Sequence, residues 1–145
     1  MDSKKLESYI SKGYNCSQVV FAYFADDMGM YEDLAVKIAT PFEMGMYKSE
    51  ICGALSGAYM ALGLKYGSTD MDKKVELIEK ILKLNNEFEK QMGSSNCREL
   101  LNTDINTDEG MNHAIENNLL TSVCGNCITN AIKITEDIIT EDSNI

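Results

Sequence analysis

The stretch ICGALSGAYMALGL, residues 51–64, is the most apolar part of the chain. It is too short to cross a bilayer, because a membrane-spanning helix needs about 20 apolar residues. Lys48, Glu50 and Lys65 also lie close to its ends. An apolar pattern without a polar face is typical of a helix that is buried on all sides. The sequence therefore predicts a central core helix here.

Small residues recur along this helix, with Gly53 and Gly57 four positions apart. A glycine inside a helix costs up to about 1 kcal/mol relative to alanine. Two glycines on one face therefore indicate that another backbone, or a cofactor, approaches closely. We expect Ser49 to cap this helix, the helix to span residues 50–66, and Gly67 to end it.

Helical periodicity continues on both sides of this stretch. Asn15 and Thr107 are predicted N-caps, and Pro41 limits the third helix. Longer helices are predicted at 15–28, 50–66, 70–92 and 122–140, and shorter ones at 3–11, around 34–38, at 97–101 and after Thr107. The fold class is therefore all-α, a single domain over residues 1–145 that forms a bundle of about five to seven helices around the apolar one.

The composition narrows the possible partners and compartments. The chain has 145 residues, with 23 acidic and 13 basic side chains, so its net charge is −10. Nucleic acids and anionic membranes bind basic surfaces, so the acidity argues against both. The N-terminal residues MDSKKLE are charged and lack the apolar segment of a secretory signal. We therefore expect a cytoplasmic protein without membrane insertion, in a compartment where thiols stay reduced unless they have a function.

Two of the five cysteines follow the predicted N-caps Asn15 and Ser49, and the other three follow the polar stretches at residues 94–96 and 121–122. We therefore expect each cysteine to lie in or near the first turn of a helix. Free backbone amides and the positive end of the helix dipole favour the thiolate there. The thiolate is the form that attacks disulfides, reacts with peroxide or binds a metal. For any one cysteine, the alternative role is that of a small buried hydrophobic residue. The cysteines are Cys16, Cys52, Cys97, Cys124 and Cys127.

The last two cysteines form a C-x-x-C motif, Cys124-Gly-Asn-Cys127, at the predicted start of the final helix. This arrangement suits thiol–disulfide exchange, although the β-α-β context of a thioredoxin fold is missing. Ile128 follows Cys127 where c-type haem attachment requires histidine, so the motif excludes that cofactor. A single C-x-x-C without a second pair is a weak indication of zinc.

The order of these motifs along the chain is specific. Cys16 lies in NCSQ, Cys52 opens CGALSG before AYMALGL, Cys97 follows FEKQMGSSN, and the C-x-x-C pair precedes the last helix. In this order the chain resembles the C_GCAxxG_C_C family of putative redox-active proteins, which are small helical proteins with four cysteines and a CGAxxG motif. The resemblance covers residues 11–139 and implies functional roles for Cys16, Cys52 and Cys97.

The resemblance leaves the fourth cysteine open between Cys124, which has the better spacing to the residues that follow, and Cys127, which would then be additional. Some relatives are joined to multihaem cytochrome segments and are associated with iron–sulfur clusters, as in the split-Soret cytochromes. The resemblance therefore implies an alternative hypothesis, in which four cysteines hold an iron–sulfur cluster or, less favoured, zinc. That ligand set is Cys16, Cys52, Cys97 and Cys124.

The leading hypothesis is a redox-active protein, with thiol–disulfide oxidoreductase-like or electron-transfer activity, whose cysteines converge and cycle between thiol and disulfide. Cys16 and Cys52 are the expected core pair, since both begin apolar helices, and Cys97 and the C-x-x-C thiols would be partners. Gly53 and Gly57 would admit a partner helix or a cofactor. The expected partner is a redox protein or a small thiol, and the apolar central helix could support a homodimer. A third hypothesis is a helical interaction domain with structural cysteines.

Two other patterns are interpreted as surface features. The segment from Asp104 to Gly110 imitates a calcium loop but has Glu109 where such a loop needs glycine, so we expect a solvated acidic loop. His113 is the only histidine, and its polar surroundings predict an exposed side chain.

Overall fold

The computed structural model describes residues 1–143 and is all-α, as predicted. Within these residues there is no strand, and seven of the eight α-helices have at least seven residues. The expected domain, residues 1–145, includes two residues, 144 and 145, that lie outside the described part. The helices are α1 (Ser3–Ser11), α2 (Cys16–Ala25), α3 (Glu32–Ala39), α4 (Gly53–Tyr66), α5 (Met71–Met92), α6 (Cys97–Leu101), α7 (Asp108–Glu116) and α8 (Leu119–Ser143).

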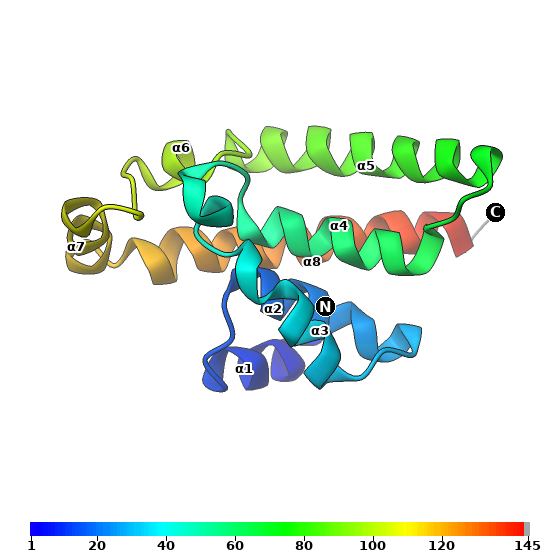
Figure 1. Ribbon diagram of the computed structural model, residues 1–145, viewed down its shortest axis with the longest axis horizontal. Helices are drawn as coiled ribbons and strands as arrows, with labels where there is room; N and C mark the ends of the chain where they lie inside the picture. Colours follow the sequence, from blue (N-terminus) through cyan, green and yellow to red (C-terminus); the bar gives the residue numbers. More distant parts are fainter. Residues whose placement is uncertain (144–145) are drawn as a thin grey trace.

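The helices form three layers (Figure 1). Helices α4 and α8 lie together in the middle, α5 runs along one side of them, and α1 to α3 cover the other side. Helices α6 and α7 lie near the end of the bundle at which α8 begins. Helix α4 contacts α2, α5 and α8, so the predicted central position of the apolar helix is confirmed.

The core forms where α4 packs against α2. Ala54, Leu55 and Leu62 of α4 are fully buried, as are Val19 and Val20 of α2. These side chains come from the two most apolar helical patterns in the sequence, which explains why they form the centre of the bundle.

Gly57 allows the two helices to approach closely. A Cβ atom added at Gly57 would lie 2.7 Å from the carbonyl oxygen of Ser17 and 3.2 Å from the amide nitrogen of Phe21. The neighbour of Gly57 is therefore the backbone of α2. The sequence had left open whether another backbone or a cofactor approaches this glycine. Gly63, later in the same helix, has nothing within 4 Å of an added Cβ.

The predicted start of α4 was wrong. The helix begins at Gly53 with Cys52 as its N-cap residue, and Ser49 is not the cap. Residues 43–50 form a separate tight turn, in which Met44, Met46 and Tyr47 have φ angles of 55°, 61° and 59°. These left-handed backbone angles cannot belong to a right-handed helix, so α4 starts only after the turn.

The predicted start of α8 was also wrong. The helix begins at Leu119 rather than near Ser122. Asn118 has a left-handed φ angle of 56°, which separates α7 from α8 immediately before Leu119. The amide of Ser122 already donates to the carbonyl of Asn118, so the first helical turn precedes the C-x-x-C motif. Cys124 and Cys127 therefore lie inside α8 and away from its positive dipole end.

The other predicted caps are confirmed. Asn15 accepts from the amide of Gln18, whose side chain accepts from the amide of Asn15, so the two residues form a capping box. Thr107 accepts from the amide of Gly110 at the start of α7. Asn96 does the same for Glu99 at the start of α6.

Within residues 1–143, no helix is long and apolar enough to cross a membrane. Most of the apolar surface of α4 is covered by the neighbouring helices of the same chain, and Tyr59, Met60 and Leu64 are half-buried. The dimer stays a prediction. The exposed apolar side chains of α5 lie on one ridge of that helix, at Met71, Val75, Ile78 and Leu82.

The close approach at Gly57 yields a stability prediction. Gly57→Ala is expected to lower the free energy of unfolding by about 1–3 kcal/mol, because the new methyl group meets backbone atoms that cannot rotate away. Gly63→Ala is the matched control in the same helix, and it should raise stability by up to about 1 kcal/mol. Urea unfolding followed by circular dichroism measures both changes. Equal effects of the two substitutions would contradict the role of Gly57.

Candidate functional site

Two backbone hydrogen bonds bring Cys52 and Cys97 together. The amide of Cys52 donates to the carbonyl of Ser95 at 2.8 Å, and the amide of Cys97 donates to the carbonyl of Glu50 at 2.5 Å. An isolated bridge between Ile51 and Asn96 lies between these two bonds. The segments that precede α4 and α6 therefore run side by side, and each delivers a cysteine at the start of a helix.

Cys16 reaches the same place through the start of α2. The Asn15 amide group donates to the Glu43 carboxylate at 2.5 Å and to the Thr40 carbonyl at 3.2 Å, which fixes the first turn of α2 against the segment before α4. A Cβ atom added at Gly53 would lie only 2.3 Å from the sulfur of Cys16. Gly53, the residue after Cys52, thus leaves the space in which the Cys16 thiol lies.

Cys124 and Cys127 enter from α8. Because they are three residues apart in a helix, both side chains lie on the face of α8 that meets α4 and α6. Cys127 is 2% exposed, whereas Cys124 is only partly buried.

All five cysteines line one cavity of about 370 Å³. Cys52 and Cys97 are 7% and 8% exposed, and none of the five is in a disulfide. The sequence predicted this convergence, and the structure brings all five predicted residues together. Gly53 also lines the cavity, whereas Gly57 lies against α2.

Cys52 is the thiol whose environment favours the charged form. Its pKa lies below the ordinary value, first because the Cys127 thiol donates a hydrogen bond to its sulfur, and then because the amides of Leu55 and Ala54 do the same. Burial opposes this shift. The amides belong to the first turn of α4, so the expected effect of a helix N-terminus is present at Cys52.

The other thiols are held in the neutral form. Burial, and then the charge at Cys52, raise the pKa of Cys97 to about 12 and that of Cys124 to about 11. The same two causes raise the pKa of Cys16. Cys127 also has a raised pKa, chiefly because its proton is shared with Cys52. The cavity therefore favours one negative charge, at Cys52, with protonated thiols around it.

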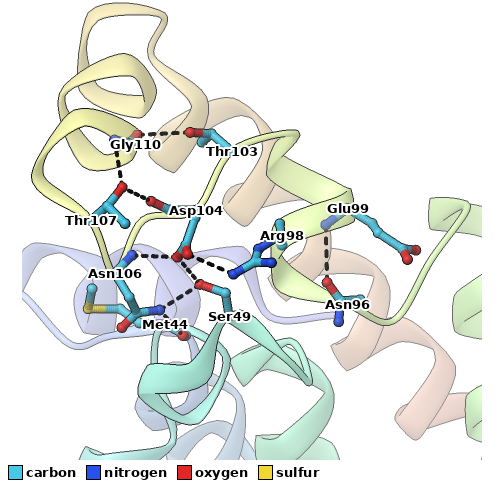
Figure 2. Close-up of polar contacts among 10 residues, drawn as sticks. All are labelled: Met44, Ser49, Asn96, Arg98, Glu99, Thr103, Asp104, Asn106, Thr107 and Gly110. Atoms are coloured by element: carbon cyan, nitrogen blue, oxygen red, sulfur yellow. Dashed lines mark hydrogen bonds and ion pairs between the residues drawn. The ribbon is translucent and has the colours of Figure 1, made fainter.

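A polar network holds the turn at residues 43–50 against the loop between α6 and α7 (Figure 2). Ser49 donates to the carboxylate of Asp104, which also accepts from Arg98 at 2.7 Å. The side chain of Asn106 donates to Ser49 at 2.7 Å and to the carbonyl of Met44 at 3.0 Å. Since Met44 lines the cavity, these bonds fix one of its walls.

Sequence reasoning missed this network. It interpreted Asp104 as part of a solvated loop and Ser49 as a helix cap, but the two side chains bind each other although they are 55 positions apart. No local pattern signals such a contact. His113 is exposed, and its carbonyl accepts a hydrogen bond from the Asn117 side chain. It does not line the thiol cavity.

Comparison with known proteins agrees with this arrangement. Residues 14–138 match the family described as putative redox-active protein (C_GCAxxG_C_C). The chain belongs to this family. No curated protein and no solved structure gives a match. In this C_GCAxxG_C_C protein, each residue named in the CGAxxG motif has a structural role. Cys52 is the N-cap residue of α4, Gly53 leaves room for the Cys16 sulfur, and Gly57 allows the backbone of α2 to approach.

The bond between Cys127 and Cys52 predicts how the thiols titrate. Cys127→Ala removes the strongest donor to the Cys52 sulfur and is expected to raise the pKa of Cys52. Cys127→Ser retains a hydroxyl donor and should keep that pKa lower than Cys127→Ala does. The pH dependence of Cys52 alkylation, followed by mass spectrometry, measures the difference. Identical profiles for the two variants would contradict the proposed cause.

The hydrogen bonds of the Asn106 side chain predict how strongly the turn at residues 43–50 is held in place. Asn106→Ala removes both bonds to the turn, so amide hydrogen exchange in residues 44–50 is expected to become faster. Asn112→Ala, at an exposed position of α7, is the control and should leave that exchange unchanged.

The same region should loosen in acid. Hydrogen bonds from Ser49 and the Asn106 amide, followed by the charge of Arg98, lower the pKa of Asp104. This stabilisation is complete above the ordinary pKa of an aspartate and is lost as pH falls through the lowered value. Exchange that stays unchanged across this acidic range would show that the carboxylate does not hold the turn.

Proposed function

We propose that the protein is a dithiol redox protein in which Cys52 is the nucleophile and Cys127 is the thiol that closes a disulfide with it. The observation that supports this most directly is the position of Cys52 at the start of α4, in the same cavity as the Cys127 thiol. The pKa of Cys52 is lowered and that of Cys127 is raised, so a thiol that ionises more readily lies in one cavity with a thiol that retains its proton. Thiol–disulfide chemistry needs this combination.

The proposed reaction removes two electrons from the pair. The Cys52 thiolate attacks an oxidant, and the Cys127 sulfur then attacks Cys52 to form the S–S bond. A disulfide needs the two Cα atoms within about 7 Å, and α4 and α8, which carry these residues, pack directly against each other. An external thiol that is small enough to enter the cavity would return the two electrons.

This pairing differs from the pair that the sequence favoured, Cys16 with Cys52. Cys16 lies in the same cavity, where the charge at Cys52 raises the pKa of Cys16, but Cys16 is not among the groups that lower the pKa of Cys52. We propose that Cys16, Cys97 and Cys124 are further thiols that lie within reach of the pair and exchange with it. A reducing compartment such as the cytoplasm is part of this proposal, because it keeps all five thiols available.

The alternative is an iron–sulfur cluster or a zinc ion on the predicted ligands Cys16, Cys52, Cys97 and Cys124. Among residues 1–143, no group of three or more His, Cys, Asp or Glu side chains is arranged to hold a metal ion. The sulfur atoms as they lie therefore do not fit a single metal ion such as zinc. None of the five cysteines is paired at disulfide distance, so closing the disulfide also requires two sulfur atoms to approach each other. We favour dithiol chemistry because it needs the approach of only two sulfurs, whereas a cluster needs four ligands.

Oxidation of the reduced protein tests the proposal. Treatment with the thiol oxidant diamide is expected to consume two thiols rapidly and to yield a peptide in which Cys52 is linked to Cys127, identified by mass spectrometry. Cys52→Ser and Cys127→Ser should each abolish this linkage, whereas Cys124→Ser should retain it.

The iron, sulfide and thiol content of the anaerobically purified protein can contradict the dithiol proposal in two ways. Stoichiometric iron and sulfide with visible absorbance would replace the dithiol proposal by the cluster. Five thiols that resist diamide in the folded protein, without metal, would leave only structural cysteines.

A further inference from the structure

The reactive pair is inaccessible to another protein. Cys52 and Cys127 are 7% and 2% exposed, and they lie where α4 and α8 meet inside the bundle. Thiol exchange requires the attacking sulfur to approach the disulfide directly, and a protein disulfide cannot enter a space of about 370 Å³. The oxidant that reaches Cys52 must therefore be a small molecule that enters the cavity.

The walls of the cavity select an uncharged and apolar molecule. Leu101 and Ile105 are buried side chains at one side, and Ile128 of α8 lies at the other. Among the described residues that line it, Glu43 is the only one with a charged side chain. An anion such as glutathione disulfide would lose its hydration here and meet like charges, both from Glu43 and from a chain with a net charge of −10.

We propose that the cavity binds small apolar organic hydroperoxides, which Cys52 and Cys127 reduce to the corresponding alcohols. This inference rests on the proposed dithiol function and names the substrate class for it. A cavity of this size is within the range of small-molecule sites, which is about 300–1,000 Å³.

The reaction balances in two steps. The Cys52 thiolate attacks the terminal oxygen of R–O–OH, the O–O bond breaks, Cys52 becomes a sulfenic acid, and the departing alkoxide takes the proton of Cys127. The Cys127 thiolate then attacks the Cys52 sulfur, forms the disulfide and expels hydroxide, which becomes water by taking up the proton that the Cys52 thiol released to the solvent when it ionised. The two electrons come from the two thiols, and an external dithiol restores them by reducing the disulfide.

The geometry favours an O–O bond over an S–S bond as the target. An alkoxide is a strongly basic leaving group that needs a proton as it departs, whereas a thiolate can leave without one. Cys127 lines the same cavity as the attacking sulfur, and its raised pKa keeps its proton available there. An attacked disulfide would in addition leave half of its substrate attached to Cys52 in the same cavity.

Single-turnover kinetics with the anaerobically reduced protein tests the inference. Cumene hydroperoxide is expected to oxidise the Cys52–Cys127 pair at least about tenfold faster than hydrogen peroxide, because its apolar group gains contact with the walls. The product 2-phenyl-2-propanol should form in an amount equal to that of the disulfide. Excess dithiothreitol should make the reaction catalytic.

A variant that reduces the cavity gives a second measurement. A Cβ atom added at Gly125 meets nothing within 4 Å, and this residue lines the cavity. Gly125→Leu is therefore expected to fold and to slow the reaction with cumene hydroperoxide by at least about tenfold more than that with hydrogen peroxide. Gly63→Leu adds the same side chain to an open position away from the cavity, so it should not change this ratio.

Three outcomes would overturn the inference. If diamide closes the disulfide but cumene hydroperoxide reacts no faster than hydrogen peroxide, the substrate class is wrong while the dithiol function stands. If dipropyl disulfide oxidises the pair faster than cumene hydroperoxide, the target is an S–S bond. If neither diamide nor any peroxide links Cys52 to Cys127, the dithiol function itself fails.

Discussion

The packing of α4 directly against the backbone of α2 is the constraint on which the rest of the structure depends. Because Gly57 has no side chain, the backbone of α2 at Ser17 and Phe21 lies close to α4. One turn earlier, Gly53 leaves the space that the Cys16 sulfur uses. The same absence of side chains therefore builds the core and places the first two cysteines next to each other, which gives the CGAxxG spacing a single physical explanation.

Gathering five thiols creates an electrostatic problem that the helix start resolves. In a buried cavity a second thiolate would repel the first, so the thiols compete for one negative charge. The pKa of Cys52 is lowered because the first-turn amides of α4 and the Cys127 thiol act on its sulfur. The net charge of −10 opposes any thiolate, so the stabilisation has to be local, as the sequence indicated. The set therefore consists of one thiol with a lowered pKa and four thiols with raised pKa values.

The sequence predicted the helices and the central position of the apolar one, because these follow from periodicity and local caps. That the cysteines share one site was implied by the resemblance to the family. The prediction failed where a contact between distant residues decides the structure. The start of α4 depends on Ser49 binding Asp104, and no window of sequence contains both residues. Which cysteines lie next to each other likewise depends on how α8 packs against α4, and spacing within one helix does not show this.

The left-handed turn before α4 is a structure that the sequence did not predict. A residue other than glycine in this conformation costs roughly 1–2 kcal/mol, and Met44, Met46, Tyr47 and Ser49 all adopt it. Gly45 lies among them with Glu50 and Cys97 so close that a Cβ atom would clash with the amide of Glu50. Such a turn persists only when its surroundings determine it, and here Asp104 and Asn106 do so. The loop between α6 and α7 therefore acts on the thiol cavity in two ways: its hydrogen bonds hold the turn that carries Met44, and its own Ile105 lines the cavity.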